Sequence, residues 1–306
     1  MATLPATAAR SGRSRLRRAE WPWVLLFLGP NLALFLIFTV FPVFYGFFLS
    51  FQKWNVIEPM QFIGLANYQR FFLEDKLTGK VVLNTLYYAV AAMPAQIALA
   101  LCFAILLNQG IGLLGLWRGV FYLPMVTSAV AIGLIWKWLY AKQFGAFNAL
   151  VGLAGIPRQD WLFDETLVIP AIVLTAIWTA LPLKIIFFLA ALQGVPPELY
   201  EAAAIDGANR WSKFWHVTWP LISPTTFFLC IIGIIGLLVG GFDLIWTMTK
   251  GGPLDASTTI VIHIFRNAFV YYDMGYASAM AYMLFLVILA LTIIQWRLQK
   301  RWVHYS

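Results

Sequence analysis

Three charged residues stand inside otherwise apolar sequence and are the first candidates for chemistry: Lys137, Lys184 and Asp243. A charged side chain within a membrane-spanning segment is costly and often marks a substrate or ion pathway. Lys137 is flanked by Trp136 and Trp138 near the end of its apolar run, so snorkelling to the headgroups explains it. Lys184 lies deep in its run and Asp243 near the end of another. Each of these two either reaches an interface or faces a transport pathway.

Four common motifs for nucleotide, metal, serine or thiol chemistry are absent from the sequence. It has no GxxxxGKS or GxxxxGKT phosphate loop, no HExxH, no GxSxG and no CxxC. His216, His263 and His304 lack metal-ligand spacing and are interpreted as interfacial residues. Cys102 and Cys230 lie in apolar runs and are interpreted as buried, inert thiols. We therefore expect no catalytic residue, metal or cofactor in this chain.

Composition places most of the chain in a membrane. It is 61% hydrophobic and 11% charged, with a mean hydropathy of +0.79, whereas a soluble domain is about 25% charged. A membrane span needs about 20 apolar residues. We predict an all-α polytopic protein with six transmembrane helices, over 23–51, 81–108, 119–141, 167–193, 221–247 and 275–297. Pro30 and Pro42 predict a kink or an interfacial turn in the first span.

The distribution of basic residues predicts the orientation. An arginine-rich segment precedes the first span, and the segments on its side of the membrane carry more basic residues than those on the other side. We therefore expect 1–22 to be a cytoplasmic basic tail and 52–80 an external loop. The segment 81–297 then forms a core of five spans, and 298–306 is a cytoplasmic C-terminus.

The connection between the fourth and fifth spans, 194–220, has the sequence of two short helices. Pro197 suits a helix start, and the alanines at 202–204 favour helix and present a small, smooth surface. Gly207 ends this helix because glycine adopts positive φ without strain. An aromatic segment follows, and Pro220 ends it. Such a surface suits close approach by another protein; the alternative is a helix resting on lipid headgroups.

The spacing in this connection resembles the EAA motif of binding-protein-dependent ABC importer permeases. The motif is Glu201-Ala202-Ala203, followed by Gly207 and ending at Pro220. Val217 and Trp219 stand where the family has Ile and Leu. Further segments resemble carbohydrate-uptake permeases of the maltose-permease type: 62–68, 118–124, 251–253, 258–259 and 275–279.

The resemblance implies a type I ABC importer transmembrane domain in a bacterial or archaeal cytoplasmic membrane. In that family two permeases, here a heterodimer, face each other across a pathway. Two ATP-binding cassette subunits, which use ATP and magnesium, dock below, and an extracytoplasmic solute-binding protein delivers substrate. The family's glutamate, here Glu201, pairs with a base on the ATPase. The implied ATPase-coupling residues are Glu201, Ala202, Ala203, Asp206, Gly207 and Pro220.

The resemblance also points to a substrate pathway. By register with maltose-type permeases, Thr179, Leu183 and the glycines at 240–241 lie near the sugar site. Trp178 either stacks on a sugar ring or packs within the bundle. The GxxxG pair Gly236 and Gly240 predicts either helix packing or backbone that lines the pathway. The candidate pathway residues are Trp178, Thr179, Leu183, Gly240, Gly241 and Asp243.

The sequence thus predicts a non-enzymatic permease subunit of an ATP-driven importer in the lipid bilayer, with no nucleic-acid partner. Its solute is a sugar or a sugar-like molecule such as glycerol-3-phosphate. An ion-coupled secondary transporter is the alternative, and it predicts uptake that survives ATP depletion and collapses with the ion gradient. A membrane scaffold is a third class, and it predicts a purified complex without ATPase.

Overall fold

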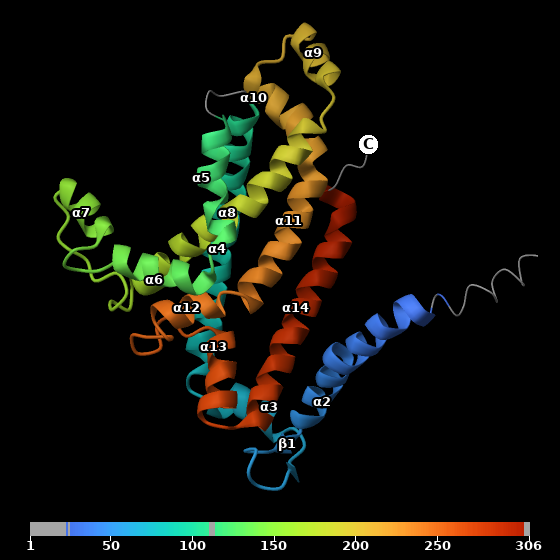
Figure 1. Ribbon diagram of the computed structural model, residues 1–306, viewed down its shortest axis with the longest axis vertical. Helices are drawn as coiled ribbons and strands as arrows, with labels where there is room; N and C mark the ends of the chain where they lie inside the picture. The colour runs from blue at the N-terminus through green and yellow to red at the C-terminus, as the bar shows by residue number, and fades with distance from the viewer. Residues whose placement is uncertain (1–22, 24, 110–113, 303–306) are drawn as a thin grey trace, which may run out of the picture.

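Long apolar helices dominate the computed structural model, which describes residues 23, 25–109 and 114–302 (Figure 1). The predicted basic tail, 1–22, and residues 303–306, with His304, lie outside the described residues. Within the described ranges, five helices have the length and composition of membrane spans: Leu25–Leu49, Thr78–Asn108, Val168–Gln193, Arg210–Val239 and Met274–Gln299. They correspond to five of the six predicted spans, so the prediction of a helical polytopic membrane protein is confirmed.

Short helices, π-helical turns and one two-stranded ribbon join these spans. The ribbon is antiparallel, with Gln52 opposite Phe62. The elements in chain order are η1 (Leu36–Val40), α2 (Phe41–Leu49), β1 (Gln52–Lys53), β2 (Gln61–Phe62), α3 (Ala66–Gln69), η2 (Arg70–Glu74), α4 (Thr78–Asn108), α5 (Leu114–Val126), α6 (Ala129–Leu139), α7 (Ala146–Leu153), α8 (Val168–Gln193), α9 (Pro197–Ile205), α10 (Arg210–Lys213), η3 (Phe214–Thr218), α11 (Trp219–Val239), α12 (Phe242–Met248), α13 (Ile260–Phe265), η4 (Arg266–Val270) and α14 (Met274–Trp302).

The predicted third span, 119–141, is not one straight helix. α5 and α6 meet at an angle of 114° across a short break. Pro124 lies in the last turn of α5, and the hydroxyl of Ser128 accepts a hydrogen bond from the amide of Ala131 at 3.2 Å to begin α6. A serine N-cap favours the start of a new helix because it satisfies an amide in the first turn that has no carbonyl partner within that helix. The local caps override the continuous apolar pattern.

The predicted fifth span, 221–247, ends early. α11 stops at Val239, and α12 then turns away from it (Figure 1). Gly240 is extended, and Gly241 has φ +85°, in the left-handed region that favours glycine. Asp243 therefore lies in the first turn of α12 and not at the outer end of a span. A carboxylate is stabilised there by the helix dipole.

Two prolines within long helices follow a π-helical turn. η1 precedes Pro42 in the first span, and η3 precedes Pro220. The helix that begins at Arg210 runs through Pro220 to Val239, which corrects the prediction that Pro220 ends the preceding segment. Proline lacks an N–H and its ring displaces the carbonyl four residues earlier. The wider turn accommodates that displacement without ending the helix.

α4 and α8 pack along each other at the centre of the bundle. One stripe of α4 with a spacing of four residues is almost completely buried: Ala92, Gln96, Ala100 and Ala104. Small side chains let the two backbones approach closely. Gln96 donates through Nε2 to the carbonyl of Ala176 on α8 at 3.1 Å, which places this stripe against α8.

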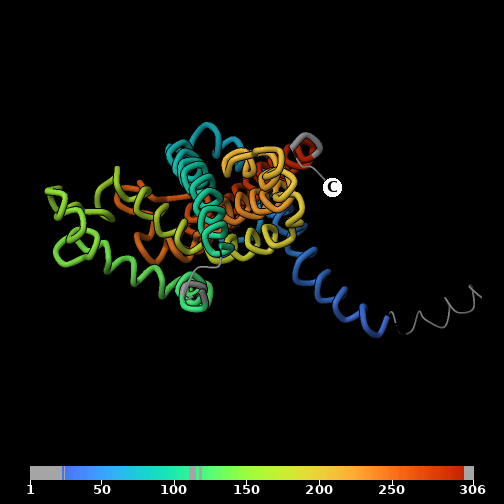
Figure 2. Tube along the Cα trace, turned by 90° about the horizontal axis from the view of Figure 1, so that it is seen from above, coloured from blue at the N-terminus to red at the C-terminus, as the bar shows by residue number. Residues whose placement is uncertain are grey.

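The first helix, Leu25–Leu49, diverges from this bundle (Figures 1 and 2). Its apolar side chains are largely exposed in the isolated chain, Phe27 by 73%. It joins the bundle near its C-terminal end, where the hydroxyl of Tyr282 donates to the carbonyl of Val43.

Exposed side chains also occur on the other spans. Cys102 on α4 is exposed, which corrects its prediction as a buried thiol. Apolar surface of this extent is covered by lipid or by another protein in a membrane.

At the end of the bundle opposite α9, polar contacts join the segment before α4 to the segment around α13. Asp75 accepts hydrogen bonds from His263 Nε2 at 2.8 Å and from the Tyr276 hydroxyl at 2.7 Å. Arg70 pairs with Asp273 at 2.6 Å and lies 4.0 Å from the Tyr276 ring centroid. His263 is buried among these contacts, and its predicted position at the membrane interface stays a prediction. Burial raises the pKa of Asp75, but hydrogen bonds from Tyr276 and His263 outweigh it and hold that pKa below its ordinary value.

Replacing Asp75 with Asn should lower the free energy of unfolding by about 1–3 kcal/mol, because two buried donors lose a charged acceptor. Thermal unfolding of the purified protein in detergent at neutral pH measures this change. The matched control is Asp160→Asn, whose partner Lys142 is largely exposed, and we expect a change below about 1 kcal/mol. Equal losses in the two variants would contradict this account of the network.

The difference in unfolding temperature between the wild type and Asp75→Asn should depend on pH. Because the pKa of Asp75 is lowered in the folded protein, its stabilisation is fully present above the ordinary carboxylate pKa and is lost as pH falls through the folded value. The gap in unfolding temperature between wild type and Asp75→Asn should therefore narrow in acid. A gap that stays constant down to the pH of acid unfolding would count against this assignment.

Candidate functional site

The loop between α8 and α11 projects from one end of the bundle (Figure 1). α9 begins with Pro197 at its first position, where the missing N–H costs no hydrogen bond. Glu198 lies in its first turn, at the positive end of the helix dipole. No residue of α9 is buried, and Glu201 and Ala202 are exposed. α9 therefore offers a free, small-featured surface with a carboxylate on it.

α9 ends in a Schellman motif built on Gly207. The amide of Gly207 donates to the carbonyl of Ala204 at 3.1 Å, and the amide of Ala208 donates to the carbonyl of Ala203 at 2.9 Å. Gly207 has φ +80°, as its sequence position predicted. An added Cβ would meet no atom within 4 Å. Backbone conformation, and not crowding, is therefore the reason that this position favours glycine.

Two side-chain hydrogen bonds fix the rest of the loop. Asn209 caps α10 by accepting from the amide of Ser212 at 2.8 Å. The hydroxyls of Tyr200 on α9 and Thr218 on η3 lie 3.0 Å apart. His216 is exposed on η3, and its Nδ1 lies 2.9 Å from the carbonyl of Ser212. Because η3 continues into α11, the orientation of α9 is tied to a membrane helix.

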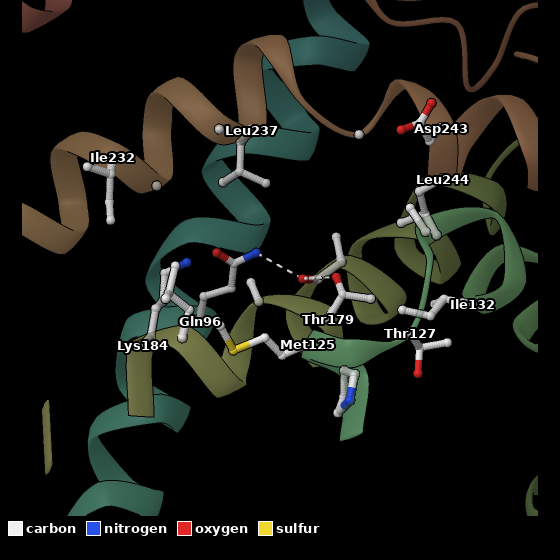
Figure 3. A pocket seen from close by; sticks show the side chains of 18 of the residues that line it. Gln96, Met125, Thr127, Ile132, Thr179, Lys184, Ile232, Leu237, Asp243 and Leu244 are labelled. Carbon is white, nitrogen blue, oxygen red and sulfur yellow. Dashed lines mark hydrogen bonds between the residues drawn. The ribbon is translucent and has the colours of Figure 1, made fainter. Parts of the chain in front are cut away.

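A cavity of about 480 Å³ lies in the middle of the bundle, between α4, α6, α8, α11 and α12 (Figure 3). Thr127, at the break between α5 and α6, and Gly241, at the break between α11 and α12, both line it. Its polar side chains are Tyr88, Gln96, Thr127, Thr179, Lys184 and Asp243. Within the part of the chain that the structure describes, no group of three or more His, Cys, Asp or Glu residues could hold a metal ion.

The cavity brings together four of the six predicted pathway residues: Thr179, Leu183, Gly241 and Asp243. Trp178 lies elsewhere, with its ring centroid 5.6 Å from that of Trp136 in an aromatic cluster between α6 and α8. This position matches the packing interpretation of Trp178. Gly240, which follows the last residue of α11, is not part of the cavity wall either.

The two glycines of the GxxxG pair have different surroundings. Gly236 lines the cavity, and a Cβ on it would meet no atom within 4 Å. A Cβ on Gly240 would lie 2.3 Å from the Gly236 carbonyl oxygen. The glycine that approaches another helix is Gly233, where a Cβ would lie 2.7 Å from Met93 Sδ. Among the described residues, the pair therefore shapes a helix end and a cavity wall and does not form a helix–helix contact.

Lys184 is 6% exposed and lines the cavity. A Cβ on Gly233 would lie 3.6 Å from Lys184 Cε, so the side chain extends towards α11. Of the two interpretations of Lys184, the pathway-facing one fits this position. Gln96 was not identified from the sequence, although an amide two residues after Pro94 in an apolar span was the available signal.

A family model described as "Binding-protein-dependent transport system inner membrane component" matches residues 77–304, well over half of the chain. The chain belongs to this family. It is therefore a multi-pass permease of an ABC transporter, as the EAA-like spacing predicted. The match begins just before α4, so the helix Leu25–Leu49 precedes the matched region.

Similar proteins are named as ABC transporter permeases or as permease proteins of transport systems for a stated solute. The permease is 32% identical over 284 residues to the probable ABC transporter permease protein YesP of Bacillus subtilis, covering 92% of this chain and 91% of that protein. It is 31% identical to the arabinooligosaccharides transport system permease protein AraP of Bacillus subtilis, covering 96% and 94%. It is 27% identical to the sn-glycerol-3-phosphate transport system permease protein UgpA of Agrobacterium fabrum, covering 92% and 96%.

The fold is that of type I ABC importer permeases. A chain in the crystal structure of a bacterial ABC transporter involved in the import of the acidic polysaccharide alginate matches with a TM-score of 0.79 and 24% identity. The match covers 93% of the permease and 96% of that chain. A related structure of the alginate transporter, in complex with an alginate pentasaccharide-bound periplasmic protein, matches with a TM-score of 0.80.

Alanine substitutions at the GxxxG pair should have opposite effects on the stability of the permease. Gly240→Ala should destabilise it by about 1–3 kcal/mol, because its Cβ meets a backbone oxygen that cannot rotate away. Gly236→Ala should be neutral or stabilising by up to about 1 kcal/mol, since alanine is the better helix former and space is free. Thermal unfolding in detergent measures both. A loss at Gly236 as large as that at Gly240 would show that the pair packs against another helix after all.

Proposed function

We propose that this permease is the transmembrane subunit of an ATP-driven, binding-protein-dependent importer of a sugar or a sugar-like solute. The observation that carries the proposal is the α9 loop, an exposed helix with small side chains that is held rigidly to a membrane helix. The chain is then a transport subunit and not an enzyme. Two separate ATPase subunits use ATP and magnesium, and both chain termini lie in the cytoplasm.

Coupling runs through α9. Glu201 is exposed and free to pair with a base on the ATPase, while Asp206 and Gly207 set the angle at which α9 meets the rest of the loop. The Tyr200–Thr218 bond and the direct passage of η3 into α11 support transmission of a movement of α9 to the spans. ATP closes the ATPase dimer and shifts the permease from inward-facing to outward-facing, and hydrolysis resets it.

The central cavity serves as half of the translocation pathway. Leu183 lines it yet is 42% exposed, so this chain does not close the cavity wall by itself. A second permease in a heterodimer supplies the facing half. The network around Asp75 supports the opposite end of the bundle, where an extracytoplasmic solute-binding protein delivers its solute.

The cavity wall supports a hydroxyl-rich solute. Tyr88, Gln96 and Thr179 supply hydroxyl and amide groups that hydrogen-bond sugar hydroxyls, on an otherwise apolar wall. The names of AraP and UgpA refer to arabinooligosaccharides and sn-glycerol-3-phosphate, both hydroxyl-bearing solutes. We assign the same broad class to this permease.

An ion-coupled secondary transporter is the competing function. Lys184 and Asp243 line the cavity and are the observation that favours it, because intramembrane charges can carry ions or protons. Proteoliposomes decide between the two functions. Uptake that requires internal ATP and persists when ionophores collapse the ion gradients supports the importer; the reverse pattern supports the secondary transporter.

Replacing Glu201 with Ala should reduce ATP-driven uptake by the reconstituted complex by at least about tenfold, because an interfacial charge pair loses one partner. Uptake of the solute held by the partner binding protein, together with ATPase rate, measures the effect. Glu198→Ala, on the same helix and equally exposed, is the matched control and should keep most of the uptake. Wild-type uptake by Glu201→Ala would overturn the assigned role.

Substitutions at Gly207 should separate backbone conformation from side-chain size. Gly207→Val should reduce coupling of hydrolysis to uptake, because a β-branched residue is strained at φ +80°. Gly207→Asn should retain more coupling, since asparagine tolerates the left-handed region. The ratio of solute transported to ATP hydrolysed is the measurement. Equal ratios for the two variants would show that the turn does not set the docking angle.

A further inference from the structure

One charged side chain in the central cavity is explained neither by packing nor by coupling. Lys184, near the middle of α8, is buried and lines the cavity. Its Cε lies close to Gly233 of α11, so its stem extends towards α11 in the interior of the bundle. Figure 3 shows Lys184 on the same side of the cavity as Gln96.

No carboxylate neutralises Lys184 among the residues that the structure describes. It forms no ion pair there. Its electrostatic neighbour is the thiol of Cys230, a group that is ordinarily uncharged near neutral pH. Asp243, the acidic residue of the cavity wall, lies at the opposite end of the cavity in Figure 3. A cation that lines an otherwise apolar cavity without a counter-charge is less stable than one paired with an anion, so an arriving anion stabilises it.

The surroundings of Lys184 leave space for a ligand of sugar size. A volume of about 480 Å³ is within the range of small-molecule sites. Gly236 adds free space on the α11 side of the cavity, since no atom lies within 4 Å of its would-be Cβ. Gln96 of α4 and Thr179 of α8 also line the cavity and supply neutral hydrogen-bonding groups.

We propose that Lys184 makes this pathway selective for acidic solutes, namely sugars or polyols that carry a carboxylate or a phosphate group. The inference rests on the proposed importer function and adds the substrate class to it. The Lys184 ammonium donates charge-assisted hydrogen bonds to the anion. Gln96 and Thr179 hydrogen-bond the hydroxyls of the same molecule. The solute thereby supplies the counter-charge that the described cavity wall lacks near Lys184.

The test is binding to the complete importer, purified in detergent with its second permease and both ATPase subunits. Isothermal titration calorimetry, with and without a non-hydrolysable ATP analogue, compares two matched pairs of probes. α-1,4-Digalacturonate is paired with α-1,4-galactobiose, and glycerol-3-phosphate with glycerol. The two members of each pair differ in their acidic groups. The first pair tests recognition of a carboxylate, and the second tests recognition of a phosphate.

We expect the wild-type complex to bind the acidic member of at least one pair about tenfold more tightly than the neutral member, or better. Lys184→Gln should abolish that preference, and Lys184→Arg should retain much of it because the charge remains. Lys137→Gln is the matched control; this lysine is exposed and does not line the cavity, so the preference should persist. An unchanged unfolding temperature shows that each variant is folded.

Absence of an acidic preference in both pairs, or a preference that survives in Lys184→Gln, overturns the inference. The proposed importer function is tested separately. ATP-driven uptake and ATPase rate are compared between the wild-type complex and the Glu201→Ala complex, purified in the same way. A complex that couples through Glu201 but shows no acidic preference is still an importer, and then only the role of Lys184 is wrong. A complex that lacks ATPase subunits refutes the importer itself.

Discussion

Hydrocarbon offers no hydrogen bonds to a peptide group, and this constraint governs where the chain can interrupt its helices. Backbone can leave the helical pattern at membrane depth only where protein or a water-filled cavity surrounds it. The breaks at Thr127 and at Gly241 meet this condition, since both residues line the central cavity. At Pro42 and Pro220 the chain instead widens one turn and remains helical. The cavity therefore lies where the helices break.

One continuous helix links the two functional regions. From Arg210 to Val239 it runs from the turn after α9 to the cavity, where Gly236 forms part of the wall. The Tyr200–Thr218 bond joins α9 to the start of that helix. In the proposed coupling, a displacement of α9 would move the cavity wall on α11, because a helix is stiff along its axis. The contacts of Asp75 join elements at the far end of the bundle.

The centre of the bundle combines close packing with polar groups. The alanine stripe of α4 lets α8 approach, and Gln96 in the same stripe bonds across to α8 while lining the cavity. Lys184 Cε lies 3.6 Å from where a Cβ on Gly233 would be, and the same glycine makes room for Met93 of α4. Close packing of small residues and two buried polar side chains thus share the centre of the bundle.

The sequence by itself determined the membrane helices, the family and the turn at Gly207. Apolar length is a property of a single segment, and a Schellman turn needs only the residues next to it. The burial of His263 came only with the tertiary structure, because it depends on Asp75, a partner distant in sequence. The bend after Val126 and the early end of α11 rest on neighbouring residues, Ser128 and Gly241, but a continuous apolar pattern across each break predicted a single span. Which residues line the cavity also depends on the tertiary structure. The wall includes Thr179 and Lys184 but not Trp178, since neighbouring helices, and not local sequence, set which face of α8 points into the cavity.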